Sequence, residues 1–279
     1  MAEGADRMTG KPATRSRVRR SAPASSKKPA KGSAKPSAKG VAKAAPRRSV
    51  IGWALRWTFR YLLRAAAVFV VLLLLWVGLL RFVDPPFGGP YMIGEFGRLG
   101  TLRYEPLPLG RFGLRAGQAA VAAEDARFCE HKGLDWAAIE LALDEYVTSG
   151  RLRGGSTITQ QTAKNVFLWH GRTMVRKALE VPMAGLIELV WGKERILEMY
   201  LNIAEFDEGV FGLEAGAKHY YGVPAAALTD LQMARMMTLL PAPKSRNPKA
   251  LSATLERRAR RIAAGVGTIE AQGLDLCFR

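Results

Sequence analysis

The stretch RLRGGSTITQQTAKN, residues 151–165, decides how the rest of the chain is interpreted. Two glycines free the backbone just before Ser156 or Thr157, and either of these residues can cap a helix. The first turn of the predicted helix has unpaired N–H groups, which make that end an anion site. One face of this helix presents donors and no acidic side chain, from Ser156, Gln160 and Lys164, with Gln161 beside them. Such a face suits a phosphate or a sugar, and the alternative is a solvated, capped helix.

A second polar cluster, EDARFCEHKG, lies upstream at residues 124–133. An alanine-rich helix is predicted over residues 116–129, ending near Gly133. In that helix Glu124 and Phe128 share one face, whereas Asp125 points about a quarter turn away. Partial desolvation in a cleft would raise the pKa of Glu124 toward the range of a general base, while Asp125 stays ionised as a structural acceptor. The alternative is a polar helix end without chemistry.

Two downstream segments add charge. In RTMVRKALE, residues 172–180, Arg176 and Glu180 stand four residues apart with Lys177 alongside, which is typical of an exposed ion pair. In WGKERILEMYLN, residues 191–202, Lys193 and Arg195 precede an amphipathic helix, which alone indicates a solvated face. It is the accumulation of two glutamates and several cations downstream of an apolar segment that favours a reaction centre.

Helical spacing dominates the second half of the chain. Apolar residues recur at this spacing after Asp135, a plausible N-cap, at Trp136, Ile139, Leu143 and Val147. Further helices are predicted over residues 159–168, 173–191 and 228–240, and one more around an apolar face formed by Ile196, Leu197, Tyr200 and Leu201. Alternating strand patterns are scarce, and residues 84–113 are rich in Pro and Gly, typical of an irregular linker or membrane-proximal lobe. We therefore expect a mainly helical domain over residues 85–270.

The positive charge is concentrated at the N-terminus. Residues 1–60 contain sixteen of the 42 Lys/Arg and two of the 24 Asp/Glu, so the rest of the chain is only +4. Few large apolar side chains are present there, which predicts a disordered tail over residues 1–60. The tail lacks interleaved aromatics, so attraction to an anionic lipid surface is favoured over binding to nucleic acid.

An uncharged apolar run, AAAVFVVLLLLWVGLL, occupies residues 65–80. A helix over residues 61–83 is about 34 Å long at ~1.5 Å per residue, enough to span a membrane. No small-x-small cleavage site follows the run, which favours a retained anchor over a signal peptide. Basic residues on its N-terminal side place the tail in the cytoplasm and the remainder across the membrane.

The chain has two cysteines, Cys129 and Cys277, and three histidines. Two cysteines exclude a disulfide scaffold, and the sequence alone leaves open whether they pair; two unpaired thiols packed as small hydrophobes are the simpler expectation. None of the histidines has a zinc-ligand spacing, and the G-x-S-x-G and phosphate-loop motifs are absent from the sequence.

The ordered set EDARFCEHKG, GGSTITQQTAKN, RKALE, KERILEMYLN and LLPAPKSRNP resembles the five successive motifs of the peptidoglycan glycosyltransferases, glycosyltransferase family 51. The match covers residues 113–248, and the stretch that follows it is too short for a transpeptidase domain. In this respect the sequence resembles the monofunctional branch of the family. The resemblance implies a lysozyme-like helical glycosyltransferase domain at residues 114–270 that polymerises lipid II into β-1,4-linked glycan strands with inversion, releasing undecaprenyl diphosphate.

The resemblance also assigns roles. Glu124 matches the base that deprotonates the 4-hydroxyl of the acceptor sugar, and Glu180 matches a second glutamate acting at the diphosphate or its metal. The residues expected to bind substrate, including the cations that steady the leaving phosphates, are Ser156, Thr157, Gln160, Gln161, Lys164, Arg176, Lys177, Lys193 and Arg195. No obligatory cofactor is implied, and Mg²⁺ or Mn²⁺ at the diphosphate stays an option.

Partners follow from the same resemblance. They are lipid II, the growing glycan strand and membrane lipids, with cell wall synthesis or division proteins as candidates and no nucleic acid. The expected location is the bacterial inner membrane, crossed once, with a cytoplasmic N-terminus and a periplasmic catalytic domain.

Two positions depart from the family pattern. Pro182, two residues after Glu180, predicts a kink that alters how this glutamate is aimed, and Asp207 stands where glycine is usual. Two other functions compete: a lysozyme-like hydrolase or lytic transglycosylase, which needs no phosphate-binding cations, and a non-catalytic anchor whose tail binds nucleic acid or a cytoplasmic partner.

Overall fold

The computed structural model describes residues 50–150, 155–169, 171 and 173–279. The predicted disordered tail falls outside these residues up to residue 49. Helix α1 (Val50–Leu80) includes residues 50–60, so for these residues the prediction of disorder is wrong. Within the described residues, the segment from Gly52 to Leu80 is the one helix that is long and apolar enough to cross a membrane, which supports a single-pass anchor.

The segment after α1 is more regular than expected. Helix α2 (Pro90–Leu99) occupies ten residues of the predicted irregular linker, with a proline in its first turn and the left-handed Gly100 at its end. Strand β1 (Arg103–Tyr104) and the short helix α3 (Leu109–Phe112) follow. The prediction failed here because short helices flanked by Gly and Pro resemble loops in composition.

The end of α1 is tied to the helical domain by two side chains of helix α7 (Met174–Ile203). Trp191 Nε1 donates to the Val77 carbonyl at 2.7 Å. The Arg195 guanidinium donates to the Leu80 carbonyl at 2.8 and 3.0 Å and to the Val83 carbonyl at 3.0 Å. These carbonyls are among those that a helix end leaves without intrahelical partners.

Helix α7 consists of two pieces. Gly192 has φ 77°, a left-handed conformation that suits glycine, and it separates the piece before it from the piece that begins at Lys193. This break agrees with the predicted helix end at residue 191. The second piece buries the predicted apolar face, since Ile196, Leu197, Tyr200 and Leu201 are at most 1% exposed.

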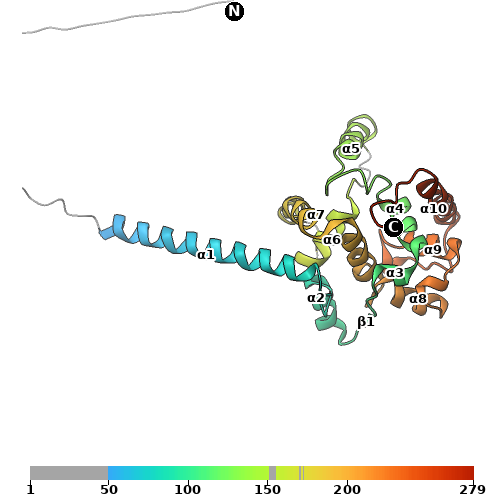
Figure 1. Ribbon diagram of the computed structural model, residues 1–279, viewed down its shortest axis with the longest axis horizontal. Helices are drawn as coiled ribbons and strands as arrows, with labels where there is room; N and C mark the ends of the chain where they lie inside the picture. Colours follow the sequence, from blue (N-terminus) through green and yellow to red (C-terminus); the bar gives the residue numbers. More distant parts are fainter. Residues whose placement is uncertain (1–49, 151–154, 170, 172) are drawn as a thin grey trace, which may run out of the picture. The chain divides into compact units, whose positions relative to one another are not determined.

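Most of the remaining helices pack against α7 or against one another, whereas α5 (Trp136–Ser149) stands apart (Figure 1). Helix α6 (Ile158–Phe167) packs against α7, and α4 (Leu114–Glu124) packs against α9 (Asp230–Met237) and α10 (Ala253–Ala271). Helix α5 begins after Asp135, which accepts from Ala138 N as an N-cap, but none of its residues is buried. Helix α8 (Leu213–Tyr221) and two single-turn helices, η1 (Ala225–Ala227) and η2 (Pro243–Ser245), complete the domain.

A small sheet follows α7 directly. Strands β2 (Glu205–Asp207) and β3 (Val210–Phe211) are antiparallel, and β1 pairs in parallel with β3, giving the order β1-β3-β2. The pairing has an irregularity between Glu205 and Asp207. Asp207, which departs from the family pattern, pairs with His219 at 2.9 Å.

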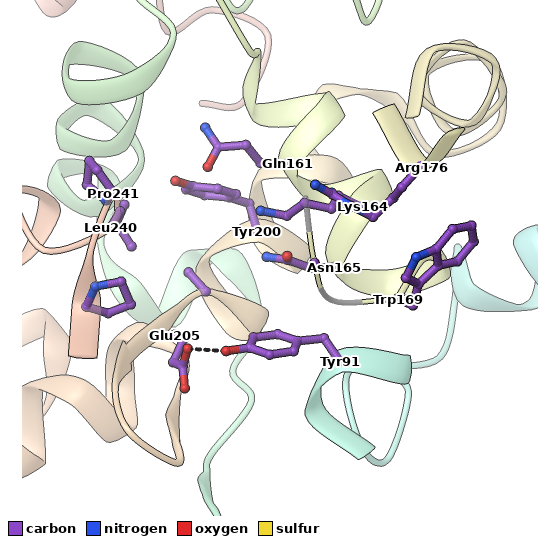
Figure 2. A pocket seen from close by; sticks show the side chains of 13 residues that line it. Tyr91, Gln161, Lys164, Asn165, Trp169, Arg176, Tyr200, Glu205, Leu240 and Pro241 are labelled. Atoms are coloured by element: carbon purple, nitrogen blue, oxygen red, sulfur yellow. Dashed lines mark hydrogen bonds between the residues drawn. The ribbon is translucent and has the colours of Figure 1, made fainter. Parts of the chain in front are cut away.

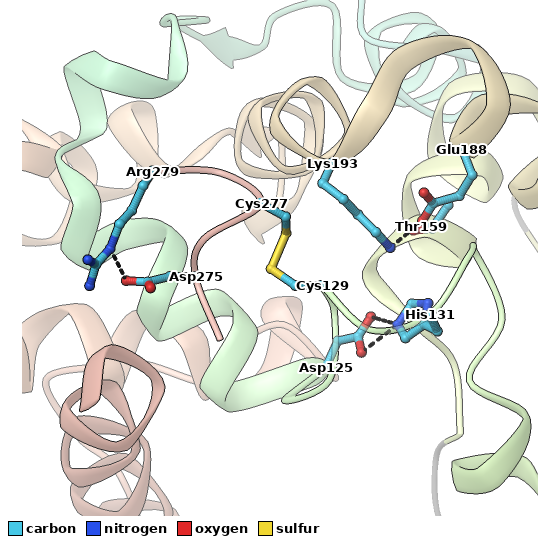
Figure 3. Close-up of a disulfide and its surroundings, with 9 residues drawn as sticks. All are labelled: Asp125, Cys129, His131, Thr159, Glu188, Lys193, Asp275, Cys277 and Arg279. Carbon is cyan, nitrogen blue, oxygen red and sulfur yellow. Dashed lines mark hydrogen bonds and ion pairs between the residues drawn. A yellow bond between two sulfur atoms is a disulfide. The ribbon is translucent and has the colours of Figure 1, made fainter. Parts of the chain in front are cut away.

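The expectation of two unpaired thiols is wrong, because Cys129 and Cys277 form a disulfide with Cα atoms 5.6 Å apart (Figure 3). The chain end returns to the segment after α4, where the Phe278 and Phe128 rings lie 6.3 Å apart. This proximity depends on tertiary packing between residues 148 positions apart in sequence, so local spacing could not indicate it. The disulfide fastens the C-terminal segment beside the residues that follow Glu124.

Candidate active site

Glu124 is the last residue of α4, and its side chain is 13% exposed. Its Oε2 accepts a hydrogen bond from Gln161 Nε2 at 3.2 Å, and Arg258 Nη2 lies 3.1 Å from its Oε1. Burial raises the pKa of Glu124, while Gln161 and Arg258 act in the opposite direction. Glu124 is therefore a partly desolvated carboxylate, as predicted for a general base.

The helix ends at Glu124, so the prediction that it continues to near Gly133 is wrong. The reason is Asp125, whose Oδ2 accepts from Ile158 N in the first turn of α6 at 3.0 Å. His131 Nε2 lies 2.9 and 3.0 Å from the two Asp125 oxygens (Figure 3). These bonds hold the chain out of the helix and make Asp125 the structural acceptor that was predicted.

The start of α6 is also used internally. Thr157 is the N-cap, and it forms a capping box in which its side chain accepts from Gln160 N while Gln160 Oε1 accepts from Thr157 N. Asp125 accepts a hydrogen bond from Ile158 N, and Thr157 accepts one from Gln160 N. Side chains of the protein therefore already occupy the predicted anion site at this helix end. Gln160, 3% exposed, holds the helix start and does not line the cavity described next.

A cavity of about 330 Å³ lies beyond Gln161 (Figure 2). Its lining includes polar side chains from α2, α6, α7 and β2, namely Tyr91, Gln161, Lys164, Asn165, Arg176, Tyr200 and Glu205. Lys164 has no hydrogen-bond partner among the residues that the structure describes. Desolvation lowers the pKa of Lys164, and the charge of Glu180 opposes this effect. The cavity thus contains a cation that is available to an anionic ligand.

The charged residues at the start of α7 are more buried than predicted. Arg176 and Glu180 are 9% and 3% exposed, which corrects the expectation of an exposed ion pair. Arg176 Nη1 donates to Glu180 Oε1 at 2.5 Å, and Lys177 Nζ donates to Glu180 Oε2 at 2.7 Å. Lys177 also donates to Ser156 Oγ at 2.9 Å. Glu180 therefore fixes two cations, one of which lines the cavity.

Pro182 does not break the helix there. Gly192 is the position inside α7 with a non-helical backbone, and the helix continues through Pro182 without interruption. An effect of Pro182 on the direction of Glu180 stays a prediction. The Glu180 carboxylate is held by Arg176 and Lys177.

A second, smaller cavity of about 240 Å³ lies on the other side of Glu124. It is lined by Glu124 and Arg127, with Ser156 and Thr157 from the start of α6. Glu124 therefore faces this cavity, while the Gln161 that binds it lines the larger one. The hydrogen bond between Gln161 and Glu124 thus links a residue of the larger cavity to a residue of the smaller one.

Two predicted substrate cations lie elsewhere. Arg195 binds the carbonyls at the end of α1 and pairs with Asp84 at 2.8 Å and with Glu198, so its guanidinium is engaged in anchoring. Lys193 donates to Glu188 at 2.5 Å and lies over the Phe128 ring, 4.3 Å from its centroid. Neither lines a cavity with Lys164, because tertiary contacts direct these long side chains elsewhere and sequence spacing does not show such contacts. Their substrate-binding role stays a prediction.

Sequence reasoning missed three residues of the site. Arg258 contacts Glu124 from α10, where it lies on the helical stripe of Ile262, Val266 and Ile269, a signal that was available. Tyr200 was assigned only to an apolar face, yet it lines the larger cavity. No sequence pattern indicated that Glu205 belongs to the site, and the structure places it in the short strand β2.

Comparisons with known proteins show which family the chain belongs to. The transglycosylase family model matches residues 94–266. A protein of Jannaschia sp. (strain CCS1) named biosynthetic peptidoglycan transglycosylase is 47% identical over 219 residues, covering 78% of this chain and 90% of the relative. Proteins of the same name from Pasteurella multocida and Caulobacter vibrioides are each 41% identical, covering 77% and 71% of this chain and 90% and 86% of those relatives. Because the family model spans more than half of the chain and the relatives are covered almost completely, this chain belongs to the transglycosylase family.

Proposed function

We propose that this chain is an inverting peptidoglycan glycosyltransferase that polymerises lipid II into β-1,4-linked glycan strands. Its relatives are named for peptidoglycan transglycosylation, and family membership supports glycan strand formation in cell wall synthesis. The observation that carries the proposal is the position of Glu124. A partly desolvated carboxylate lines the smaller cavity and accepts a hydrogen bond from Gln161, which lines the cavity that contains Lys164.

On the acceptor side, the smaller cavity receives the sugar whose 4-hydroxyl attacks. Glu124 takes the hydroxyl proton, and the oxygen forms a bond to C1 of the donor sugar as the C1–phosphate bond breaks. One carboxylate is sufficient for this inversion, because a sugar hydroxyl stands where an inverting glycosidase holds a water. The raised pKa of Glu124 brings the base closer to the working pH.

On the donor side, the larger cavity receives the diphosphate. Lys164 and Arg176 stabilise the negative charge that grows on the leaving group, since undecaprenyl diphosphate departs without needing a proton. Lys177 and Ser156 extend this positive edge toward Glu124. Fixed cations in a partly desolvated cavity act more strongly than the same charges in water.

Glu180 does not fit the role of a metal ligand on this chain. Both of its carboxylate oxygens accept hydrogen bonds from cationic side chains, Arg176 and Lys177. We assign it instead to orienting these cations. Any Mg²⁺ or Mn²⁺ that takes part would accompany the substrate phosphates.

The membrane arrangement is part of the proposal. We place α1 in the bacterial inner membrane, with the basic N-terminal segment in the cytoplasm and the catalytic domain in the periplasm. The charge asymmetry across α1 supports this orientation. The Cys129–Cys277 disulfide supports it independently, because such bonds persist mainly in oxidising compartments.

The test uses the full-length protein in detergent with purified lipid II, with glycan products sized by gel. Wild-type protein should form chains, and Glu124→Gln should form none while binding lipid II with unchanged affinity. Glu140→Gln, an exposed glutamate of α5, is the matched control and should polymerise normally. Polymerisation by Glu124→Gln, or consumption of finished glycan without use of lipid II, would contradict the proposal.

A further inference from the structure

Several residues that line the larger cavity have a buried polar atom that forms no hydrogen bond. Among the residues that the structure describes, such atoms include Arg176 Nε, Tyr200 Oη and Glu205 Oε1, and all three residues line this cavity. Buried polar groups in folded proteins are nearly always hydrogen-bonded. Their concentration in one place indicates a binding surface that a ligand completes. Glu205 is the acidic member of this set, and no role has been assigned to it above.

Glu205 is held firmly by one of its two oxygens. It is 9% exposed and begins β2, two residues after α7 ends. Its Oε2 accepts a hydrogen bond from Tyr91 Oη at 2.5 Å (Figure 2). The Tyr91 ring is itself fixed by an edge-on contact with Phe211, with centroids 5.8 Å apart. Oε2 is thereby fixed in direction, whereas Oε1 accepts no hydrogen bond and has the Lys244 ammonium 3.4 Å away.

A cationic side chain, Lys244, lies beside Glu205. Lys244 Nζ lies 3.4 Å from Glu205 Oε1 and 3.1 Å from Glu95 Oε2, so one cation is shared by two carboxylates. Burial raises the pKa of Glu205, and the Tyr91 hydroxyl and the Lys244 charge oppose this effect. The hydrogen bond from Tyr91 and the nearby ammonium both fit a carboxylate acceptor, and a hydrogen-bond donor is the ligand group that suits Oε1.

The charge of the cavity narrows the choice of donor. Lys164 and Arg176 line the same cavity of about 330 Å³, and they would repel an ammonium group placed there. The same cations attract a phosphate. A ligand that is neutral at Glu205 and anionic at Lys164 matches an amino sugar linked to a diphosphate.

We propose that Glu205 is a substrate-binding residue whose Oε1 accepts a hydrogen bond from a hydroxyl or acetamido N–H of the donor's amino sugar. This inference rests on the proposed function, in which the donor diphosphate lies at Lys164 and Arg176. Tyr91, which aims the carboxylate, is a positioning residue, and it lies outside the family match at residues 94–266. Part of this sugar contact is thus supplied by a segment that precedes the matched domain.

The decisive variant is Glu205→Gln. The amide oxygen can still accept from Tyr91, but the amide nitrogen then presents a donor to the cavity, where the sugar also presents one. For lipid II we expect kcat/KM to fall about tenfold to a hundredfold, mainly through KM, which is the range for a hydrogen bond to a charged group. Undecaprenyl diphosphate has the lipid and phosphates but no sugar, so its inhibition constant should be unchanged.

Two further variants make the test specific. Glu208→Gln changes a neighbouring carboxylate that is exposed and bound to Arg98, and it should behave as wild type. Tyr91→Phe keeps the Glu205 carboxylate but removes its anchor, so KM for lipid II should rise less than in Glu205→Gln. Thermal unfolding verifies that each variant is folded, and Tyr91→Phe alone decides the question if Glu205→Gln does not fold.

Three results would overturn the inference. The first is a folded Glu205→Gln variant with a wild-type KM for lipid II. The second is an inhibition constant of undecaprenyl diphosphate for Glu205→Gln that rises as much as KM. The third, if only Tyr91→Phe folds, is a wild-type KM for that variant. Lack of any chain formation by the wild-type protein would instead reject the proposed function, because every measurement here is a ratio to an active wild type.

Discussion

Arg258 Nη2 lies 3.1 Å from Glu124 Oε1 and joins α10 to the end of α4. The proposed base is therefore held between a neutral donor, Gln161, and a cation. Burial favours the protonated form of Glu124 and Arg258 favours the ionised form, so the charge state of the base depends on a residue about 130 positions away in the chain.

Replacing Arg258 by Gln should shift the pH dependence of polymerisation. The arginine lowers the pKa of Glu124, so its removal raises that pKa further. Because the base acts when ionised, the acidic limb of the kcat/KM profile should move to higher pH, with a smaller effect on the plateau. Arg257→Gln is the control, since Arg257 is exposed and hydrogen-bonded to Thr254. An acidic limb that stays in place would show that the pair has no influence on the base.

Lys164→Met should separate activity from stability. The ammonium is desolvated and has no hydrogen-bond partner among the described residues, so its folded-state pKa is lowered and its charge opposes folding near neutral pH. We expect kcat to fall about a hundredfold, the scale for losing one donor to a developing oxyanion, with an unchanged or higher Tm. Kinetics with lipid II and differential scanning fluorimetry measure the two effects.

The matched comparison is Lys193→Met. This change removes the partner of the buried Glu188 carboxylate and the contact with the Phe128 ring. Unfolding should become easier by about 3 kcal/mol, which lowers Tm by roughly 6–12 °C. Equal Tm values for the two lysine variants would contradict the different roles assigned to them.

Arg195→Lys should weaken the link between α1 and the domain. Lysine keeps a charge but cannot reproduce the donors that reach the Leu80 and Val83 carbonyls together. We expect a loss of about 2 kcal/mol and a Tm lower by roughly 4–8 °C, measured in detergent. Arg115→Lys, at an exposed pair with Glu270, should leave Tm unchanged, and an equal loss in both variants would argue against a specific anchor.

Reduction of the disulfide should destabilise the domain. Cross-linking residues 148 positions apart restricts the unfolded chain, and removing such a bond costs about 2–5 kcal/mol. Tm should fall on adding dithiothreitol to wild type. In the double variant Cys129→Ala/Cys277→Ala, Tm should be low and should not change with the reductant. An unchanged Tm of the wild-type protein, after both thiols have been shown to be released, would refute the prediction.

Local signals predicted much of the helical framework. The N-cap at Asp135, a cap at Ser156 or Thr157 and the apolar face around Tyr200 depend on residues within one or two turns, which spacing shows. The membrane helix was found from composition, although its start at Val50 was missed because its first residues are mixed in polarity. Where a helix is stabilised by its own neighbours, the sequence is informative.

The failures share a different origin. Helix α4 ends at Glu124 because Asp125 binds an amide of α6, a contact over 33 positions. Arg195 is directed away from the cavity by the carbonyls of α1, more than a hundred positions distant. Glu205 becomes part of the cavity through Tyr91 of α2. Each outcome depends on which distant group lies within reach of a long polar side chain, and spacing contains no such information.

The disulfide between Cys129 and Cys277 also limits when the site can be completed during biogenesis. Most of the residues assigned to substrate binding lie between these positions, whereas Glu124 precedes both, so the linkage can be made only after the ribosome has produced the segment carrying Cys277. Until then, the turn that follows Glu124 has no covalent tie to the C-terminal segment. A newly inserted molecule is thus expected to mature last at its reaction centre, and to depend on the thiol-oxidising machinery of its compartment for that step.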